Sequence, residues 1–444
     1  MMEAKYFNKA TETMSREDLA RHQFEKLERL LARIYKKNRF YTSKFDEVGI
    51  KPDDIRSLDD LPNLPMTTKD ELVDAQAADP PLGTNATYHK SEYVRFHQTS
   101  GTTGVPLRVF DTDESWEWWG RLWGHVFAAA RITPEDRIFF AFSFGPFIGF
   151  WSAVEGARRM GSMMIPSGGG DSSQRLRLMQ EVRPTVLCCT PTYALRLAEV
   201  AREENIDLGE IPIRVTLHAG EPGANIPATK ARIESAWTAK CFDHAGASEV
   251  GAYSYECDPQ PGGLHLIETE FIAEVFDPET GDPVEQGEIG ELVITSLGRP
   301  CFPAIRYRTG DLVRPNYTQC ECERTFMRFD GGILGRADDM IVIRGMNIFP
   351  RAIENLVRQF ESVDEYRVNV YTEHEMGVLE IELELSTESG VEEERRKIQR
   401  SLTNALNLRP VVKVAERGSL PRFELKAKRV RIFEDSSYPP TEES

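Results

Sequence analysis

The spacing of apolar residues predicts helices near the start of the chain. Leucine and isoleucine recur near helical spacing between residues 16 and 46, among many charged positions, which is the pattern of amphipathic helices. These apolar residues are Leu19, Leu27, Leu30, Leu31 and Ile34. After a proline-punctuated link at residues 61–65, Thr68 precedes an acidic pair, which predicts an N-capped helix over residues 66–75.

Short apolar runs then alternate with helical patterns as far as residue 245. The strand-like runs are residues 137–142, 162–166, 185–190 and 214–220, and helical patterns follow at 172–182 and 193–205. This alternation predicts α/β layers with largely parallel strands. Residues 264–330 differ, because glycine and proline turns join their strand-like runs. We expect a smaller β-rich region there.

The pattern changes again after Gly335. A strand and turn at 340–350 precede a helix at 350–360, a hairpin over 366–385 and a helix at 392–406. This content is typical of an independent α+β unit. We therefore expect an α/β protein with a large N-terminal domain over residues 1–335, which contains the β-rich subdomain, and a small α+β C-terminal domain over residues 336–444.

The composition narrows the class of protein. The 444 residues include 54 basic and 71 acidic side chains, a formal net charge of −17, which disfavours nucleic acid as the main partner. The uncharged run at residues 138–154 is short for a membrane span and contains Gly145, Pro146 and Gly149, so we expect no contact with a membrane. The N-terminus is charged and lacks the apolar core of a signal peptide. A cytoplasmic protein is the expectation.

Seven cysteines are spread unevenly along the chain, which favours reduced thiols or a metal site over a disulfide scaffold. A Cys-x7-His pair and a Cys-x-Cys pair fit one closed, structural Zn²⁺ site. These residues are Cys257, His265, Cys320 and Cys322. The alternative is four unrelated side chains, because the Cys-x-Cys spacing is tighter than in the usual zinc knuckle. The other cysteines, Cys188, Cys189, Cys241 and Cys301, are expected to be buried apolar residues.

Five short motifs carry residues that suit nucleotide chemistry. Residues 99–106 (TSGTTGVP) form either a cradle for phosphate oxygens or an ordinary hairpin turn. Glu249, beside a tight glycine turn, suits Mg²⁺ or lies in a surface loop. Asp311 suits a ribose diol or ends a strand in a turn. Taken alone, residues 335–345 are interpreted as a polar linker that runs into a strand. Residues 420–429, taken alone, are interpreted as a solvated basic face.

In order and spacing, these five motifs resemble those of the adenylate-forming superfamily of acyl-CoA synthetases. Within it, the TSGTTG loop, Ala219-Gly-Glu-Pro222 and the run from Asp338 to Pro350 are similar to the phenylacetate–CoA ligase family. The resemblance extends from about residue 60 to residue 433. It implies a large adenylate-forming domain with a small, mobile C-terminal lid.

The resemblance also implies a role for each matching residue. The ATP phosphates would be wrapped by Ser100, Gly101, Thr102, Thr103 and Gly104, with Thr102 among the catalytic residues. The adenine slot would be lined by Gly220, Glu221 and Pro222, and the nucleotide would also meet His244, Ala245, Gly246 and Ser248. Glu249 would bind Mg²⁺, Asp311 and Arg336 would hold the ribose, and Asp338 would be the hinge. Lys426 would reach the reacting carboxylate and the α-phosphate.

The sequence departs from the family pattern at two positions. The family usually has an aromatic residue where Ala245 stands, and His244 is the candidate substitute for stacking on adenine. The glycine that usually precedes the catalytic lysine is Leu425 here, which leaves Lys428 as a second candidate for that role.

The acid site that the family implies maps to the aromatic run at 142–151 and to residues 247–251. Aromatic walls with small residues between them suit a ring, so an aryl or arylacetic acid is the expected substrate. Plain core packing is the alternative for any one ring. The candidate pocket residues are Phe144, Gly145, Phe150, Ala247 and Gly251.

The sequence thus predicts an acid–thiol ligase that uses ATP, Mg²⁺ and coenzyme A, together with a structural Zn²⁺. Loading of the acid onto a carrier-protein phosphopantetheine is an alternative, because the reacting thiol is the same. A non-catalytic nucleotide- and zinc-binding protein is the alternative from another class, and the presence of Glu249, Asp311 and Lys426 argues against it. A homodimer is an open alternative to a monomer.

Overall fold

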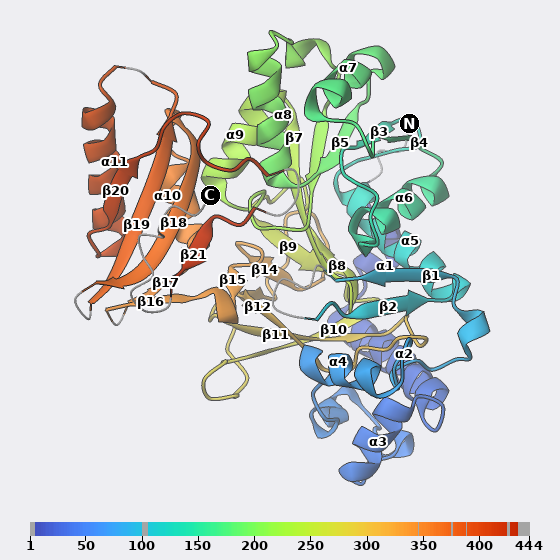
Figure 1. The fold of residues 1–444 in the computed structure, drawn as a ribbon. Helices are drawn as coiled ribbons and strands as arrows, with labels where there is room; N and C mark the ends of the chain where they lie inside the picture. The colour runs from blue at the N-terminus through green and yellow to red at the C-terminus, as the bar shows by residue number, and fades with distance from the viewer. Residues whose placement is uncertain are drawn as a thin grey trace.

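The structure is a computed structural model that describes residues 5–99, 105–344, 346–373, 376–387, 389–423 and 427–433. Figure 1 shows a larger part that contains most of the chain and a smaller part formed by the C-terminal elements beside it. This division has the form of the large and small units that the sequence predicted.

A nine-stranded sheet forms the centre of the larger part, in the order β13-β14-β9-β8-β7-β6-β5-β3-β4. Strands β3 to β7 run parallel, as the alternation of strands and helices predicted. They are β3 (Arg137–Phe140), β4 (Met163–Pro166), β5 (Val186–Cys189), β6 (Val215–His218) and β7 (Lys240–Ala247). Four helices alternate with these strands and pack along the sheet (Figure 1). These are α6 (Ile148–Met160), α7 (Ser172–Val182), α8 (Pro191–Glu203) and α9 (Pro227–Trp237).

The β-rich stretch is divided between two sheets, which differs from the single region that we predicted. Strands β8 (Gly251–Tyr255), β9 (Gly263–Leu266), β13 (Pro315–Asn316) and β14 (Arg328–Asp330) extend the nine-stranded sheet in antiparallel fashion. Strands β10 (Phe271–Phe276), β11 (Gly290–Ser296), β12 (Tyr307–Val313) and β15 (Gly335–Arg336) form a second, antiparallel sheet. Every residue of β11 is buried, so both faces of this strand need cover that an isolated surface subdomain does not supply.

The N-terminal helices cover the second sheet. The helices α2 (Arg16–Ile34) and α3 (Arg39–Glu47) bury their apolar faces in one cluster with Ile272, Leu297 and Ile305. Helix α4 (Lys69–Ala78) starts at Thr68, which forms the expected cap together with Glu71. Before these elements lies the short helix α1 (Lys9–Glu12), and after them comes a hairpin of β1 (Arg95–Gln98) and β2 (Arg108–Asp111).

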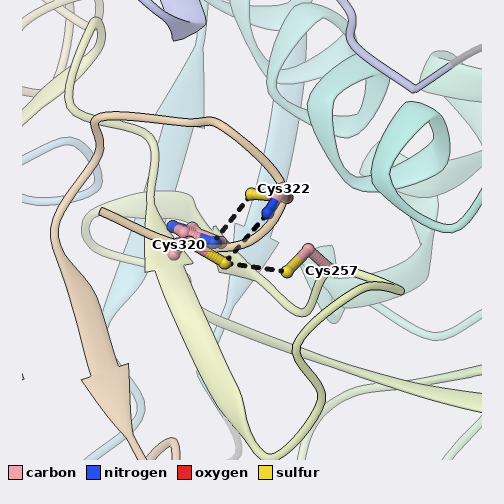
Figure 2. A group of neighbouring side chains, drawn as sticks. Cys257, Cys320 and Cys322 are labelled. Carbon is pink, nitrogen blue, oxygen red and sulfur yellow. Dashed lines mark hydrogen bonds between the residues drawn. The ribbon is translucent and has the colours of Figure 1, made fainter. Parts of the chain in front are cut away.

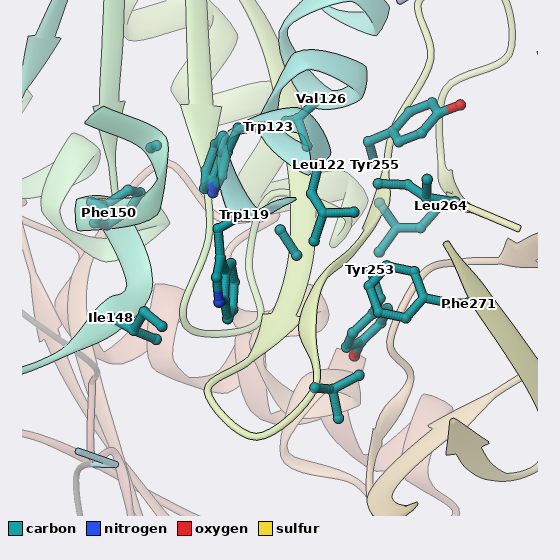
Figure 3. Close-up of a cluster of buried hydrophobic side chains, with 14 of the residues drawn as sticks. Trp119, Leu122, Trp123, Val126, Ile148, Phe150, Tyr253, Tyr255, Leu264 and Phe271 are labelled. Atoms are coloured by element: carbon teal, nitrogen blue, oxygen red, sulfur yellow. The ribbon is translucent and has the colours of Figure 1, made fainter. Parts of the chain in front are cut away.

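The largest apolar core lies between helix α5 (Asp113–Ala129) and the strands (Figure 3). Trp123 of α5 is buried there and donates its indole N–H to Ser152 of α6 at 2.8 Å. The uncharged run at 138–154 therefore forms β3 and the start of α6 within this core. Among the residues that the structure describes, no helix is both long and apolar enough to cross a membrane.

The C-terminal part has an apolar cluster of its own, which includes Ile353, Ile381 and Leu402. Its four-stranded sheet has the order β20-β19-β18-β21, with helices α10 (Pro350–Val357) and α11 (Val391–Leu406) and a small hairpin of β16 (Ile341–Ile343) and β17 (Met346–Ile348). The strands of the sheet are β18 (Val363–Glu373), β19 (Met376–Leu385), β20 (Val411–Val414) and β21 (Val430–Ile432). The predicted hairpin over 366–385 is confirmed.

Three buried histidines predict that mild acid destabilises the fold. Burial lowers the pKa of His97, His218 and His244 to about 4, below the ordinary value of 6.5. Because the folded-state pKa is depressed, the stabilisation is complete above the unfolded pKa and is lost as the pH falls toward the folded one. We expect the free energy of unfolding to fall by about 2 kcal/mol per histidine between about pH 7 and pH 5, measured by urea unfolding. A substitution of the exposed His89 should leave this slope unchanged.

Candidate active site

Parallel strands β5, β6 and β7 direct their carboxyl ends to one edge of the nine-stranded sheet, where α/β proteins commonly bind ligands. Strand β6 leads into residues 220–222, and β7 leads into the turn that contains Glu249. Strand β7 is parallel to β6 but antiparallel to β8, so the strand direction reverses at this point. Gly220 has a φ of +95°, which glycine adopts without strain.

Glu249, Asp311 and Arg336 converge at this edge although they are far apart in sequence. Nη1 of Arg336 lies 3.6 Å from Oδ1 of Asp311, and the two residues are paired on β15 and β12. The hydroxyl of Tyr253 donates to Asp311 at 3.0 Å. Burial raises the pKa of Tyr307, and the charges of Glu249 and Asp311 raise it further while Arg336 opposes them. The charges of all three predicted side chains therefore affect the pKa of the same buried phenol, that of Tyr307.

Glu249 offers one carboxylate in a mostly enclosed position. Its side chain is buried, and Oε1 lies 3.8 Å from Nζ of Lys69. An oxygen ligand from a single carboxylate suits Mg²⁺, which keeps several waters and binds substrate phosphates at the same time. The residue present therefore fits the predicted metal.

The predicted phosphate loop, residues 100–104, lies outside the described residues, but its two flanks are described. The backbone N–H of Thr99 donates to the carbonyl of Leu107 at 2.9 Å, and that of Leu107 donates to Oγ1 of Thr99 at 3.0 Å. The loop therefore joins the two strands of the β1–β2 hairpin.

A fully buried ion pair links this hairpin to the Glu249 turn. Arg299 donates to both carboxylate oxygens of Asp111 in β2, at 2.8 and 2.7 Å, and neither side chain is exposed. Nη1 of Arg299 also donates to the carbonyl oxygens of Ser248 at 2.8 Å and Glu249 at 3.3 Å. Sequence reasoning missed Arg299, because no local pattern marks a partner 188 residues away.

Lys426 also lies outside the described residues, but the residue after it contacts the strand edge. The N–H of Ala427 donates to Oε2 of Glu221 at 2.6 Å, while Oε1 of Glu221 accepts the N–H of Thr192 at 2.9 Å. Arg429 donates to Oγ1 of Thr192 at 3.3 Å. Glu221 thus joins the end of β6, the start of α8 and the chain next to Lys426. Its predicted place in the adenine slot stays a prediction.

The surfaces that meet between the two parts are largely polar. Arg422 pairs with Glu199 of α8 at 2.9 Å and with Glu384 of β19 at 2.8 Å. Arg232 of α9 donates to the carbonyl oxygens of Phe360, Glu361 and Val363 at 3.1, 3.1 and 2.9 Å. A cleft of about 700 Å³ runs along this boundary and is lined by Arg232, Arg358 and Arg422 among others.

The predicted hinge residue lies where the chain passes from one part to the other. Asp338 follows β15, which belongs to the second sheet, and precedes β16, which packs in the C-terminal cluster. Its carboxylate accepts from Nε of Arg336 at 2.8 Å. The hinge role itself stays a prediction.

The residues predicted near adenine have mixed surroundings. His244 is buried, its ring centroid lies 4.5 Å from that of Trp123, and its Nδ1 contacts the carbonyl of Ser254. This packing favours a structural role for the ring over the adenine stacking that we predicted. Ala245 is partly buried, and a Cβ on Gly246 would lie 2.9 Å from the carbonyl oxygen of Gly251, so glycine is needed for this close strand approach.

The structure brings only part of the predicted acid pocket to one cavity. A cleft of about 530 Å³ includes Gly145. It is also lined by Arg95, Phe96, His97, Trp116, Pro146, Trp151, Val154 and Glu155. Phe144 packs on Trp151 at a centroid distance of 4.7 Å. Phe150 is buried against Phe142, and Gly251 lies in the core under Trp118 and Phe271, so both are outside this lining. Ala247, at the end of β7, is also outside it.

The four predicted metal ligands come together. One ligand atom from each of Cys257, His265, Cys320 and Cys322 lies within 4.8 Å of the others, and all four residues are buried. The remaining cysteines are buried as single thiols, as predicted.

The fold and this edge define an AMP-binding enzyme, and comparison with known proteins agrees. The AMP-binding enzyme family profile matches residues 46–298, and that of the AMP-binding enzyme C-terminal domain matches 345–431. A phenylacetate–coenzyme A ligase of Thermus thermophilus is 35% identical over 84% of this chain and 83% of its own length. One from Escherichia coli is 33% identical, over 94% of this chain and 96% of its own. The chain belongs to the phenylacetate–CoA ligase family.

Solved structures of a 2-hydroxyisobutyryl-CoA ligase are similar over the whole fold. In its postadenylation state, in complex with R3-HIB-AMP, that enzyme matches with a TM-score of 0.93 at 29% identity, over 97% of this chain and 93% of that one. In its thioesterification state, with 2-HIB-AMP and CoA, the TM-score is 0.74 at 30% identity, over the same shares of both chains. The two parts of the present structure are therefore arranged more like the postadenylation state.

Proposed function

We propose that this protein activates a carboxylic acid with ATP and transfers the acyl group to coenzyme A. The observation that carries the proposal is the convergence of Glu249, Asp311 and Arg336 at the strand edge of a phenylacetate–CoA ligase family member. A carboxylate oxygen attacks the α-phosphorus, the bond to the β-phosphate breaks, and pyrophosphate leaves. The thiolate of coenzyme A then attacks the acyl carbon of the adenylate and expels AMP.

In this proposal, the main task of the chain's own residues is to place charged groups around the reactants. Both reactants of the first step are anions, so most of the rate enhancement comes from orientation and electrostatic stabilisation. Asp311 would accept hydrogen bonds from the ribose hydroxyls, and its pairing with the neighbouring Arg336 supports a fixed position for the carboxylate. Glu249 would hold Mg²⁺, which supplies positive charge to the phosphates when bound. Lys426 would supply the charge at the α-phosphate, and the contact of Ala427 with Glu221 supports its placement on this side of the molecule.

The second step requires a different arrangement of the small domain, and we propose a boundary at residues 335 and 336 with Asp338 as the hinge. The support is the lower similarity to the thioesterification state of the 2-hydroxyisobutyryl-CoA ligase than to its postadenylation state. Rotation about Asp338 would withdraw Lys426 and admit the thiol. A carrier-protein phosphopantetheine is the alternative acceptor.

An aryl or arylacetic acid is the proposed substrate, with its ring in the cleft beside Gly145. The backbone N–H of Gln98 donates to the carbonyl of Pro146 at 2.6 Å, so this cleft adjoins the chain that enters the phosphate loop. Its aromatic lining includes Phe96, Trp116 and Trp151, and aromatic walls favour a planar apolar group.

Gly145→Leu is expected to lower kcat/KM for arylacetic acids by at least about tenfold and to spare short aliphatic acids. A Cβ at Gly145 would meet no atom within 4 Å, so the new side chain occupies open space rather than disrupting the core. Gly170→Ala is the matched control, since its Cβ would make only ordinary contacts from 3.6 Å. Equal values of kcat/KM for the Gly145 variant and the parent protein would remove the cleft from the acid site.

The proposal also contains two metals, Mg²⁺ at Glu249 and one structural Zn²⁺ on Cys257, His265, Cys320 and Cys322. The closeness of the four buried ligand atoms supports the second. Zinc in a closed site of this kind has no open position for substrate, so it takes no part in the chemistry.

A screen of aromatic and aliphatic acids with ATP and Mg²⁺, with and without coenzyme A, tests the function. We expect acid-dependent release of pyrophosphate, and AMP together with an acyl thioester when coenzyme A is present. Pyrophosphate release without any transfer to coenzyme A would favour a carrier protein as acceptor. Failure of every acid to yield AMP would leave a non-catalytic nucleotide-binding protein.

A further inference from the structure

Three separate segments deliver the four ligands of the cysteine–histidine cluster. Cys257 follows strand β8, His265 lies in β9, and Cys320 and Cys322 lie in the connection between β13 and β14. Figure 2 shows the three thiols close together, with Cys257 on one segment and Cys320 and Cys322 on another. Cys257 and Cys320 are 63 residues apart in the sequence. A shared ion would therefore join distant parts of the chain.

Two distances between ligand atoms are close to the edges of a zinc tetrahedron, and all four atoms lie within 4.8 Å of one another. Bonds of about 2.3 Å to sulfur and 2.0–2.1 Å to nitrogen give sulfur–sulfur edges of about 3.8 Å and sulfur–nitrogen edges of about 3.6 Å. The Sγ atoms of Cys257 and Cys320 are 3.6 Å apart, and Sγ of Cys322 lies 3.4 Å from Nε2 of His265. A disulfide requires about 2.05 Å between sulfurs. The thiols are therefore too far apart for a disulfide and suitably spaced for one ion.

The groups around the cluster orient its ligands. Nδ1 of His265 lies 3.3 Å from the carbonyl oxygen of Phe326, and a proton on Nδ1 leaves Nε2 with a lone pair directed at the thiols. The backbone N–H of Cys322 donates to Sγ of Cys320 at 3.5 Å, which fixes the position of this sulfur within its loop.

The loop that carries Cys320 and Cys322 also holds the N-terminal segment of the chain. Arg324 pairs with Glu12 at 2.7 Å, and both side chains are buried. The hydroxyl of Tyr6 donates to the carbonyl of Cys322 at 2.8 Å, and the hydroxyl of Thr325 donates to that of Met14 at 2.7 Å. Residues 5–14 are therefore anchored on the loop from Cys320 to Thr325, which we call the cysteine loop.

We propose that the cluster binds one structural Zn²⁺ and that this ion fixes the cysteine loop as the docking site of the chain's own N-terminal segment. Each of the three thiols releases its proton to the solvent when the ion binds, and the imidazole binds through Nε2 in its neutral form. Since the cysteine loop has little regular structure, the ion supplies the order that the buried pair of Arg324 and Glu12 requires. The proposal is independent of the enzymatic activity.

Metal analysis of the full-length protein, purified without added zinc, tests the site. We expect about one zinc per chain, lost in Cys257→Ser and Cys320→Ser but kept in Cys301→Ser. Cys301 is the matched control because it is a buried thiol outside the cluster. A parent protein with far less than one zinc per chain refutes the site. If the cluster variants do not fold, displacement of zinc from the parent protein by an organomercurial, followed with a metal-indicator dye, gives the same count.

Limited trypsin digestion tests the docking. Lys9 is exposed in the docked segment, and we expect faster cleavage there once the organomercurial has displaced the zinc. Glu12→Gln should also speed this cleavage while the zinc content stays at one, because it removes the anchor and leaves the ligands intact. Cleavage at an unchanged rate after zinc loss would overturn the docking role.

Discussion

Lys426→Ala is expected to reduce acyl-adenylate formation by about 10²–10³-fold while ATP still binds, because one positive donor at the developing charge is removed. The reaction joins two anions, and the residues proposed for the ribose and Mg²⁺ remain in place. Acid-dependent exchange of pyrophosphate into ATP measures the adenylation step alone. The contact between the backbone N–H of Ala427 and Glu221 does not involve the lysine side chain, so we expect the variant to keep it.

Lys428→Ala is the matched control, two positions along the same segment. It should retain exchange activity if Lys426 carries the role. The opposite result, in which Lys426→Ala is unimpaired and Lys428→Ala is inactive, would move the role to Lys428. Transfer from preformed acyl-adenylate to coenzyme A should be little affected by either change, since the proposed rotation removes the lysine before that step.

Arg299→Ala should destabilise the fold by about 3–5 kcal/mol, because it leaves the buried carboxylate of Asp111 without a partner. Urea unfolding would measure the change. Arg21→Ala is the control, since Arg21 and its partners Glu17 and Asp18 are all exposed, and a surface pair contributes about 1 kcal/mol or less. A loss at Arg299 as small as that at Arg21 would contradict the importance of the buried pair.

The double variant Arg299→Met with Asp111→Leu separates stability from positioning. Replacing both charges by apolar side chains recovers much of the stability in other buried pairs. The hydrogen bonds from Arg299 to the carbonyls of Ser248 and Glu249 remain absent, so we expect adenylation to stay slow. Full recovery of activity together with stability would show that the pair serves only the fold.

The elements that local sequence specifies were predicted well. Helix α7 has the predicted bounds because Asp171 caps it and Gln174 completes the capping box. The β18–β19 hairpin follows from the alternation of apolar and polar residues along most of both strands. The division of the β-rich stretch between two sheets was not predictable from local sequence. Strand β9 joins the nine-stranded sheet by pairing with β8, and β14 joins it by pairing with β9, and no local pattern specifies these partners.

The site shows the same contrast between local and distant signals. Glu249, Asp311 and Arg336 lie in motifs that can be recognised one at a time, and the structure brings them together. Tyr253 and Tyr307, which lie beneath them, occupy ordinary strand positions with no distinctive pattern. His244 was assigned from its neighbour Ala245 alone, whereas its surroundings are set by Trp123, more than a hundred residues earlier.

The polar boundary between the two parts has a consequence for repeated turnover. Carbonyl oxygens and carboxylates that lose Arg232 or Arg422 can be rehydrated at once, and water replaces such partners at little free-energy cost. An apolar boundary of the same extent would expose apolar surface to water in every cycle. The free-energy cost of that exposure would oppose separation of the two parts. The rotation proposed for the small domain can therefore break and remake these contacts without unfolding either part, and high salt should shift its resting position.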